Sequence, residues 1–529
     1  METVCRSSVL SPTVRRSPNR EPPVAAQPRR AVIGLPKRSV PGPQRRPDIT
    51  VLGAVAVAAA LRFLALGDHP VAPAEAAFWE IASRTSAGVP PWPPMASLPT
   101  AMFTAFAGLN ELTVRWPSAA SGVLMVAMIA PLGRRLGGQP LARWAAWLAA
   151  TSPYLVFYDR TATALALTSL LGLAATWWYL FLTTGRPRAV AGFCASMLLL
   201  AWTSGAVVPI AVAQAAFLWV RRAGRTAWHF WLVGIAVAVV GVAPALLGWA
   251  GHVGLHLDQS RDFAAEGTAL LYKVIAPVAA FAVGETLSIA QPVGLLGLML
   301  MTVLALRGVA RLPRPGRQFV IIFWLFPVLW TATMTALVTP PSAASGVSAT
   351  VGYAFPAFGL GVAAGILSLT PALRRLAYAG LVAVAAFGLG GYFHARDVAQ
   401  PSYLLPLDRI LAFIDARAES GDQILADRAS MVPHHASRHA VRLPIIETAD
   451  RAAVASLLNA EPPPRLWHVA AADEPSESRA ALERWLATHY RSVESRRYAE
   501  SDPAMSAIRE RLLGESSNAG LVLTLYERR

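Results

Sequence analysis

Long apolar runs separated by short polar gaps dominate the sequence between Val51 and Phe393. Many of these runs approach the ~20 residues that an α-helix needs to cross the hydrocarbon core of a membrane. Charged residues make up 15% of the 529 residues, whereas an average soluble domain has roughly 25%. The sequence therefore predicts a mainly α-helical, polytopic membrane bundle and argues against an ordinary soluble enzyme.

We expect about eleven spans in this region, each one a single apolar helix. Their approximate ranges are 49–66, 116–133, 141–158, 163–182, 188–203, 205–220, 227–250, 292–306, 318–338, 350–369 and 374–393.

The gaps between these spans alternate in charge. Five of them are rich in arginine, which indicates a cytoplasmic location because basic loops stay on that side of the membrane. This places the N-terminus in the cytoplasm and the C-terminus outside, and nine acidic residues fall on the external side. High alanine content with only two lysines, Lys37 and Lys273, is typical of bacterial coding. We therefore expect a multi-pass protein of the bacterial inner (plasma) membrane.

The composition divides the chain into three parts. Residues 1–47 hold nine prolines and ten basic residues with no apolar period, which predicts a disordered cytoplasmic tail. Residues 48–393 form the transmembrane domain, with long external loops at 67–115 and 251–291. Residues 394–529 alternate predicted strands and helices, which indicates a small external α/β domain.

The net charge of +16 comes from the tail and from the membrane loops. This distribution favours contact with anionic membrane lipids over binding of nucleic acid. The two cysteines, Cys5 and Cys194, cannot build a metal site, and no glycine-rich turn follows a strand in the C-terminal domain. We therefore expect no cofactor, and nothing in the sequence supports a divalent metal.

The first external loop contains a candidate catalytic carboxylate. Glu75, Phe78, Trp79 and Ala82 follow helical spacing, so Glu75 would share the apolar face of a helix lying at the membrane surface. Partial dehydration would raise the basicity of this carboxylate and suit it to act as a general base. Alternatively, Glu75 caps the positive end of a helix that begins at Pro73.

A second candidate lies where the third span ends. Asp159 and Arg160 follow Tyr158, and Arg115 opens the preceding span from the same side. Arginine can hold a phosphate group through paired hydrogen bonds, and a neighbouring carboxylate can orient the arginine or serve as a base. Anchoring of the helix ends at lipid headgroups explains the same residues equally well.

Several segments, in this order along the chain, resemble the GT-C superfamily of membrane glycosyltransferases. The nearest branch is the bacterial one, similar to protein O-mannosyltransferases and to the lipid A aminoarabinose transferase. The segments are LRFLALGDHPVAPAEAAFWEIASR (61–84), WPPM (92–95), ELTVRWPSAASGVL (111–124), GRRLGG (133–138), TSPYLVFYDRTATALAL (151–167) and AWTSGAVVPIAVAQ (201–214).

The resemblance implies transfer of a sugar from a polyprenyl-phosphate carrier to a lipid, glycan or protein acceptor on the external face. It also implies that an Asp of the first external loop is the base. The usual Asp-Glu pair aligns with Ala74 and Glu75, so the expected Asp is replaced by Ala74. Trp92 stands where a basic residue often precedes the Pro-Pro pair.

Two hypotheses follow from the resemblance. In the first, the protein is a glycosyltransferase in which Glu75 or Asp159 is the base. Its substrate would be bound by Arg160, Arg115, Trp92 and Tyr158. In the second, the protein is a catalytically silent relative that binds the lipid carrier or assists assembly.

Overall fold

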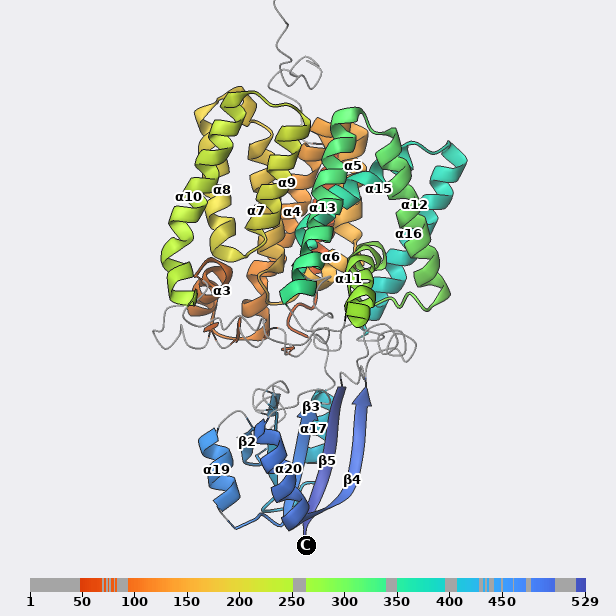
Figure 1. Ribbon diagram of the computed structural model, residues 1–529. Helices are drawn as coiled ribbons and strands as arrows, with labels where there is room; N and C mark the ends of the chain where they lie inside the picture. The colour runs from red at the N-terminus through yellow and green to blue at the C-terminus, as the bar shows by residue number, and fades with distance from the viewer. Residues whose placement is uncertain are drawn as a thin grey trace, which may run out of the picture. The chain divides into compact units, whose positions relative to one another are not determined.

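The structure is a computed structural model (Figure 1). It describes residues 48–68, 71–72, 75, 78–79, 81–82, 94–250, 263–338, 350–394, 407–427, 432, 435–436, 442–448, 451–459, 461–471, 477–499 and 520–529. The predicted tail, Ala74 and Trp92 lie outside these residues.

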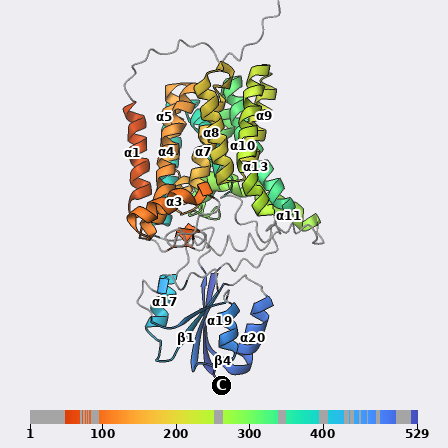
Figure 2. The same cartoon turned by 90° about the vertical axis from the view of Figure 1, so that its left-hand side faces the viewer.

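The first part of the chain is a bundle of helices, most of which run side by side (Figures 1 and 2). The helices are α1 (Ile49–Phe63), α3 (Pro94–Ala107), α4 (Glu111–Gly137), α5 (Gln139–Thr151), α6 (Pro153–Asp159), α7 (Leu165–Tyr179), α8 (Pro187–Thr203), α9 (Val207–Val220), α10 (Arg225–Ala250), α11 (Phe263–Val283), α12 (Pro292–Arg311), α13 (Arg314–Val338), α15 (Phe355–Leu367) and α16 (Pro371–Phe393). Short 3₁₀ turns lie at Leu182–Thr184 and Gly352–Ala354.

Six helices in the described part of the chain are long and apolar enough to cross a membrane. They span Glu111–Gly137, Leu165–Thr184, Arg225–Ala243, Pro292–Arg311, Arg314–Met334 and Pro371–Phe393. Shorter apolar helices accompany them, so the protein is a multi-pass membrane protein of the predicted mainly helical class. The predicted number of eleven spans stays a prediction.

Two helices depart from the predicted pattern. The predicted span 141–158 is two helices, α5 and α6, because Ser152 caps the second one and Pro153 occupies its first position. Helix α11 lies within the predicted loop 251–291. It ends at Val283. The next residue, Gly284, has a φ of 84°, which suits glycine, and a side chain there would overlap Pro153.

Helix α3, a short apolar helix, lies within the predicted external loop 67–115. Figure 2 shows it running across the direction of its neighbours, as expected of a segment too short to span comfortably.

Close backbone contact joins α12 to α15. A side chain at Gly308 would overlap the Gly361 carbonyl and the Gly365 amide nitrogen, and one at Gly365 would overlap the Leu304 carbonyl. Small residues commonly allow such an approach between membrane helices, where dispersion contacts replace the hydrophobic effect as the source of association.

This packing generates a prediction about stability. Gly308→Ala places a methyl group where a backbone already lies, so we expect a loss of about 1–3 kcal/mol. Gly390→Ala is the matched control, because no described atom lies within 4 Å of its added carbon. The helix propensity of alanine should make the control neutral or slightly stabilising. Equal unfolding midpoints of the two variants in detergent would contradict the close packing.

The C-terminal part is the predicted small α/β domain. Its elements are α17 (Leu407–Asp415), β1 (Gln423–Ala426), β2 (Ile445–Glu447), α19 (Arg451–Asn459), β3 (Arg465–Ala471), α20 (Glu477–His489), β4 (Tyr490–Ala499) and β5 (Gly520–Arg528). The sheet order is β2-β1-β3-β5-β4. Strands β1, β2 and β3 are parallel, and β5 is antiparallel to both β3 and β4.

Apolar side chains fill both faces of this sheet. The α17 residues Leu407, Ile410 and Ile414 pack on one face. Leu457 of α19 and Leu486 of α20 pack on the other. The alternation of strands and helices agrees with the α/β domain predicted for residues 394–529.

Candidate functional site

Three consecutive residues at the end of α6 contact two distant parts of the bundle, the end of α1 and the segment between α11 and α12. Tyr158 donates a hydrogen bond of 2.8 Å to Glu285, in the segment between α11 and α12. Asp159 pairs with Arg62 of α1, and Arg160 binds the carbonyl groups where α1 ends. The short helix α6 therefore ties together segments that are far apart in the sequence.

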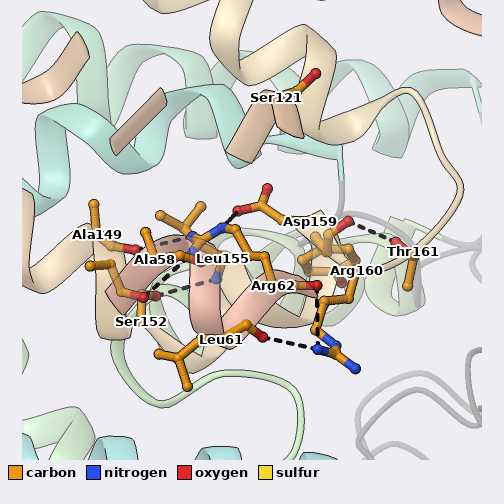
Figure 3. Close-up of polar contacts among 12 residues, drawn as sticks. Ala58, Leu61, Arg62, Ser121, Ala149, Ser152, Leu155, Asp159, Arg160 and Thr161 are labelled. Carbon is orange, nitrogen blue, oxygen red and sulfur yellow. Dashed lines mark hydrogen bonds and ion pairs between the residues drawn. The ribbon is translucent and has the colours of Figure 1, made fainter. Parts of the chain in front are cut away.

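The Arg62 and Asp159 side chains form a buried ion pair (Figure 3). Arg62 Nε lies 2.7 Å from Asp159 Oδ2, and both residues are almost completely inaccessible to solvent. The remaining Arg62 nitrogens donate to the carbonyl oxygens of Ala58, Ala149 and Ala150 at 3.2–3.3 Å. These hydrogen bonds are needed because an ion pair in the bundle interior loses its hydration.

A glycine on α4 makes room for this pair. A side chain at Gly122 would overlap the Asp159 carboxylate and would approach Arg62 Nε. Gly122 lies within the segment 111–124, which carries part of the family resemblance. The sequence did not indicate that this glycine makes room for an ion pair.

Arg160 caps the C-terminal end of α1. Its Nη1 donates to the carbonyls of Leu61, Arg62 and Leu64, and its Nη2 donates to that of Ala65 at 2.8 Å. A cation there compensates the unpaired carbonyls and the negative end of the helix dipole. Ala65 has a φ of 54°, a rare conformation for a residue with a side chain. The guanidinium thus stabilises a sharp turn of the backbone.

The aromatic residues that end α16 enclose the same guanidinium. Arg160 Nε donates to the Tyr392 hydroxyl at 3.1 Å, and the guanidinium carbon lies 4.9 Å from the centre of the Phe393 ring. Arg160 therefore uses most of its five N–H groups inside the protein. In this conformation one N–H, on Nη2, has no acceptor among the described residues. That N–H could therefore bind a phosphate oxygen without breaking a described hydrogen bond.

Glu75 and Arg115 form the second buried ion pair. Arg115 Nε lies 2.8 Å from Glu75 Oε1, and Arg115 Nη2 lies 2.5 Å from Oε2. The backbone N–H groups of Ala72 and Ala162 donate to the same carboxylate at 2.9 and 2.6 Å. Four donors therefore occupy the four lone-pair positions of this carboxylate.

The environment of Glu75 changes its acidity in the direction opposite to our sequence-based expectation. Burial alone would raise the pKa of Glu75. The charge and hydrogen bonds of Arg115, with the N–H groups of Ala72 and Ala162, outweigh burial and hold that pKa below its ordinary value. Glu75 is thus a fixed negative charge with low basicity, rather than a carboxylate made basic by dehydration.

Five of the six predicted site residues lie in one polar region. Most of their hydrogen-bonding groups contact other groups of the protein. The five are Glu75, Arg115, Tyr158, Asp159 and Arg160. Arg115 also donates to the Leu66 carbonyl, so Arg115 and Arg160 together bind the backbone from Leu61 to Leu66. We call Arg62, Glu75, Arg115, Asp159 and Arg160 the charged cluster. Trp92 lies outside the described residues.

Asp159 differs from Glu75 in its remaining capacity to accept hydrogen bonds. Arg62 is the hydrogen-bond donor to Asp159 within the described part of the chain, and it contacts Oδ2. Figure 3 shows the other carboxylate oxygen directed away from the Arg62 guanidinium. The described hydrogen bonds of Asp159 therefore involve only one of its two carboxylate oxygens.

The sequence did not identify Arg62, Glu285 or Tyr392 as members of this region. A signal for Arg62 exists, since an arginine four residues before the end of a predicted span requires an acidic or carbonyl partner. No comparable signal marks Tyr392. Among the described residues no cluster of three or more His, Cys, Asp or Glu side chains is arranged to bind a metal ion.

Comparisons with known proteins agree on the fold. The sequence profile described as dolichyl-phosphate-mannose-protein mannosyltransferase matches residues 91–249. The crystal structure of ArnT from Cupriavidus metallidurans in the apo state superposes with a TM-score of 0.52 at 15% identity, covering 90% of this chain and 97% of that one. The chain therefore resembles GT-C glycosyltransferases and has an ArnT-like fold.

Two further structures are similar at lower scores. ArnT from Cupriavidus metallidurans bound to undecaprenyl phosphate has a TM-score of 0.49 at 15% identity, covering 90% of this chain and 97% of that one. The oligosaccharyltransferase AglB from Archaeoglobus fulgidus, in complex with an inhibitory peptide and a dolichol-phosphate, has a TM-score of 0.45 at 13% identity, covering 91% and 88%. No curated protein sequence matches the chain.

The buried pair of Arg62 and Asp159 can be tested by a double-mutant cycle. Arg62→Met or Asp159→Leu leaves a buried charge without its partner, so each should destabilise the protein by about 3–5 kcal/mol. The double variant should lose clearly less than the sum of the two single losses. The measurement is the free energy of unfolding in detergent.

Arg143→Met is the matched control for this cycle. Its ion pair with Asp48 is half exposed at the arginine, so we expect a change of about 0–1 kcal/mol. Additive losses for Arg62 and Asp159 would show that the two side chains do not interact.

The lowered pKa of Glu75 predicts a dependence of stability on pH. The unfolded chain binds the proton more readily, so the ionised Glu75 stabilises the fold above the ordinary glutamate pKa of about 4.3. This contribution is lost as the pH falls through the lowered folded pKa. The stability gap between the wild type and Glu75→Gln should therefore shrink below about pH 4.

Thermal unfolding in detergent between neutral pH and pH 3 measures this gap. Glu461→Gln is the control, because Glu461 is 82% exposed and should leave stability unchanged at every pH. A gap for Glu75→Gln that stays constant into acid would contradict the assigned ionisation.

Proposed function

We propose that the protein is an integral-membrane glycosyltransferase that moves a sugar from a polyprenyl-phosphate donor to an acceptor hydroxyl. One observation carries the proposal. The profile of the mannosyltransferase family matches residues 91–249, and this segment contains Arg115, Tyr158, Asp159 and Arg160 of the polar region described above. The ArnT-like fold supports this proposal.

The proposal includes an orientation and a cellular location. We place the N-terminus in the cytoplasm and the C-terminal domain outside the bacterial inner membrane, because five arginine-rich gaps lie on the opposite side from the acidic ones. Transfer then takes place on the external face, and the acceptor is a lipid, a glycan or a protein. No metal or other cofactor is part of the proposal.

The contacts of the two carboxylates favour Asp159 over Glu75 as the base. All four acceptor positions of Glu75 are occupied, whereas the described contacts of Asp159 involve one oxygen. In an inverting transfer the acceptor hydroxyl loses a proton to the carboxylate as its oxygen attacks the anomeric carbon. The bond from that carbon to the phosphate oxygen breaks at the same time.

Arginines near Asp159 can stabilise the negative charge of the departing phosphate. Arg160 retains one N–H for this purpose, so it would supply a single hydrogen bond in the conformation observed. In this arrangement Glu75 and Arg115 hold the first loop in place, and Tyr158 positions Glu285.

This assignment predicts the effect of removing the base. Asp159→Asn keeps the shape and an acceptor for Arg62 but removes the proton acceptor, so kcat should fall by about 10²–10⁴-fold. Ser121→Ala is the control, because the Ser121 hydroxyl contacts only the Pro117 carbonyl of its own helix among the described residues. Transfer of sugar from polyprenyl-phosphate mannose and aminoarabinose by the purified protein in lipid nanodiscs is the measurement.

The activities can be compared only if the Asp159→Asn and Ser121→Ala variants are both folded. Their unfolding midpoints test this. Full activity of a folded Asp159→Asn variant would exclude Asp159 as the base.

A second candidate function follows from the same ion pairs. Both candidate carboxylates are neutralised by arginines, which suits a protein that keeps the fold but lacks catalysis. Such a relative would bind the lipid carrier or assist assembly. Binding of undecaprenyl phosphate by the wild type without transfer from any donor would favour this function over the first.

A further inference from the structure

A row of polar side chains crosses one face of the C-terminal sheet. We call it the polar row, and in the order of the strands it consists of Thr448, Asp427, His468, Thr524 and Ser495. His468 lies opposite Thr524 in the register of β3 and β5, and Thr524 lies opposite Ser495 in β4. The Ser495 and Thr524 hydroxyl oxygens are 3.2 Å apart.

The neighbouring residues on this face are apolar. Leu425, Leu466 and Tyr526 of the same strands pack against α19 and α20. Asp427 lies two residues after Leu425, so both side chains leave the same face of the sheet. The polar row therefore interrupts an apolar core, although nothing in the packing of that core requires polar groups.

Two members of the row, Asp427 and Thr448, lie at the carboxyl ends of parallel strands, where ligands bind in other proteins. Asp427 follows β1 directly and Thr448 follows β2, and both strands run parallel to β3. The chain leaves β1 towards β2 on one side and leaves β3 towards β4 on the other. Ligands of open α/β sheets typically bind outside the carboxyl ends of the strands at such a reversal.

His468 is the second, independent observation. Its Nε2 is buried and has no hydrogen-bond partner among the described residues. It lies 3.7 Å from Asp427 Oδ1, which is too long for a hydrogen bond. The Thr448 hydroxyl donates to the same Asp427 oxygen at 3.1 Å and so fixes its position. A buried ring nitrogen without a partner is unfavourable unless another group binds it.

We propose that Asp427, Thr448 and His468 bind a hydroxyl group of a saccharide. One hydroxyl oxygen placed between the two side chains can donate to Asp427 Oδ1 and accept from His468 Nε2, because a hydroxyl both donates and accepts. The Asp427 carboxylate disfavours an anionic ligand at this place. The geometry favours a group that both donates and accepts a hydrogen bond, whereas the choice of a saccharide hydroxyl rests on the proposed function.

A metal ion fits the described groups less well. Protein zinc sites use at least three strong ligands, commonly from Cys, His, Asp or Glu. The described part of the chain offers no such group of three, and the third member here is a threonine hydroxyl that already donates to Asp427.

The test uses the full chain in lipid nanodiscs and methyl α-D-mannopyranoside as the probe, with saturation-transfer NMR as the measurement. His468→Leu and Thr448→Val should each weaken binding by about fivefold or more, which is the effect of losing one hydrogen bond. His489→Leu is the matched control. His489 lies at the opposite edge of the sheet, where its Nδ1 contacts the Trp485 carbonyl at 2.9 Å, so its binding should equal that of the wild type.

Three results would overturn the inference. They are absence of saturation transfer with the wild type, equal binding by the wild type and folded site variants, and equal binding of tetrahydropyran-2-methanol, which lacks the ring hydroxyls. Zinc binding that depends on His468, without mannoside binding, would also overturn it by assigning the site to a cation. Thr448→Val keeps the inference testable if His468→Leu does not fold, because valine conserves the volume of threonine.

This result can be separated from that of the transfer assay. A protein that binds the mannoside through His468 but transfers no sugar retains the saccharide site and loses the proposed activity. A protein that transfers sugar but binds no mannoside at His468 retains the activity and loses the site.

Discussion

A guanidinium buried in a helical bundle needs several acceptors, because its removal from water costs several kcal/mol. Arg62, Arg115 and Arg160 meet this requirement with two carboxylates and with carbonyl groups from α1 and the residues after it. Their acceptors come from segments as distant as α1, α5 and α6. The end of α1, the first loop and α6 are therefore positioned together and cannot shift independently without exposing or unpairing a charge.

The same ion pairs limit the chemistry that this region can perform. A carboxylate that receives four hydrogen bonds is a good structural anchor and a poor proton acceptor, as the lowered pKa of Glu75 illustrates. Asp159 keeps an oxygen for other donors while Arg62 fixes its orientation. Catalysis by positioned carboxylates depends on this combination of a rigid support and an unused lone pair.

The sequence could predict the helices but not their side-chain partners. Most helices of the bundle were predictable because their apolar runs match the thickness of a membrane. The C-terminal domain was predictable because strands and helices alternate in its sequence. Arg62 and Asp159 are 97 residues apart, so no local spacing rule relates them. The environment of Glu75 was predicted from its own helix face, whereas Arg115 of α4 and the backbone of Ala162 determine it. Helix α11 was missed because its sequence lies in a gap between stronger apolar runs.

Hydrogen-bond saturation distinguishes a supporting charge from a binding group in both parts of the chain. Glu75 and Arg160 use nearly all their hydrogen-bonding capacity inside the protein, so replacing either would first cost stability. Asp159 in the bundle and His468 in the C-terminal sheet are also buried, yet each retains an atom to which no described residue forms a hydrogen bond. These two atoms are the observations on which our proposed ligand contacts rest, and the saturated hydrogen bonds of Glu75 and Arg160 are the reason why we give those residues a supporting role.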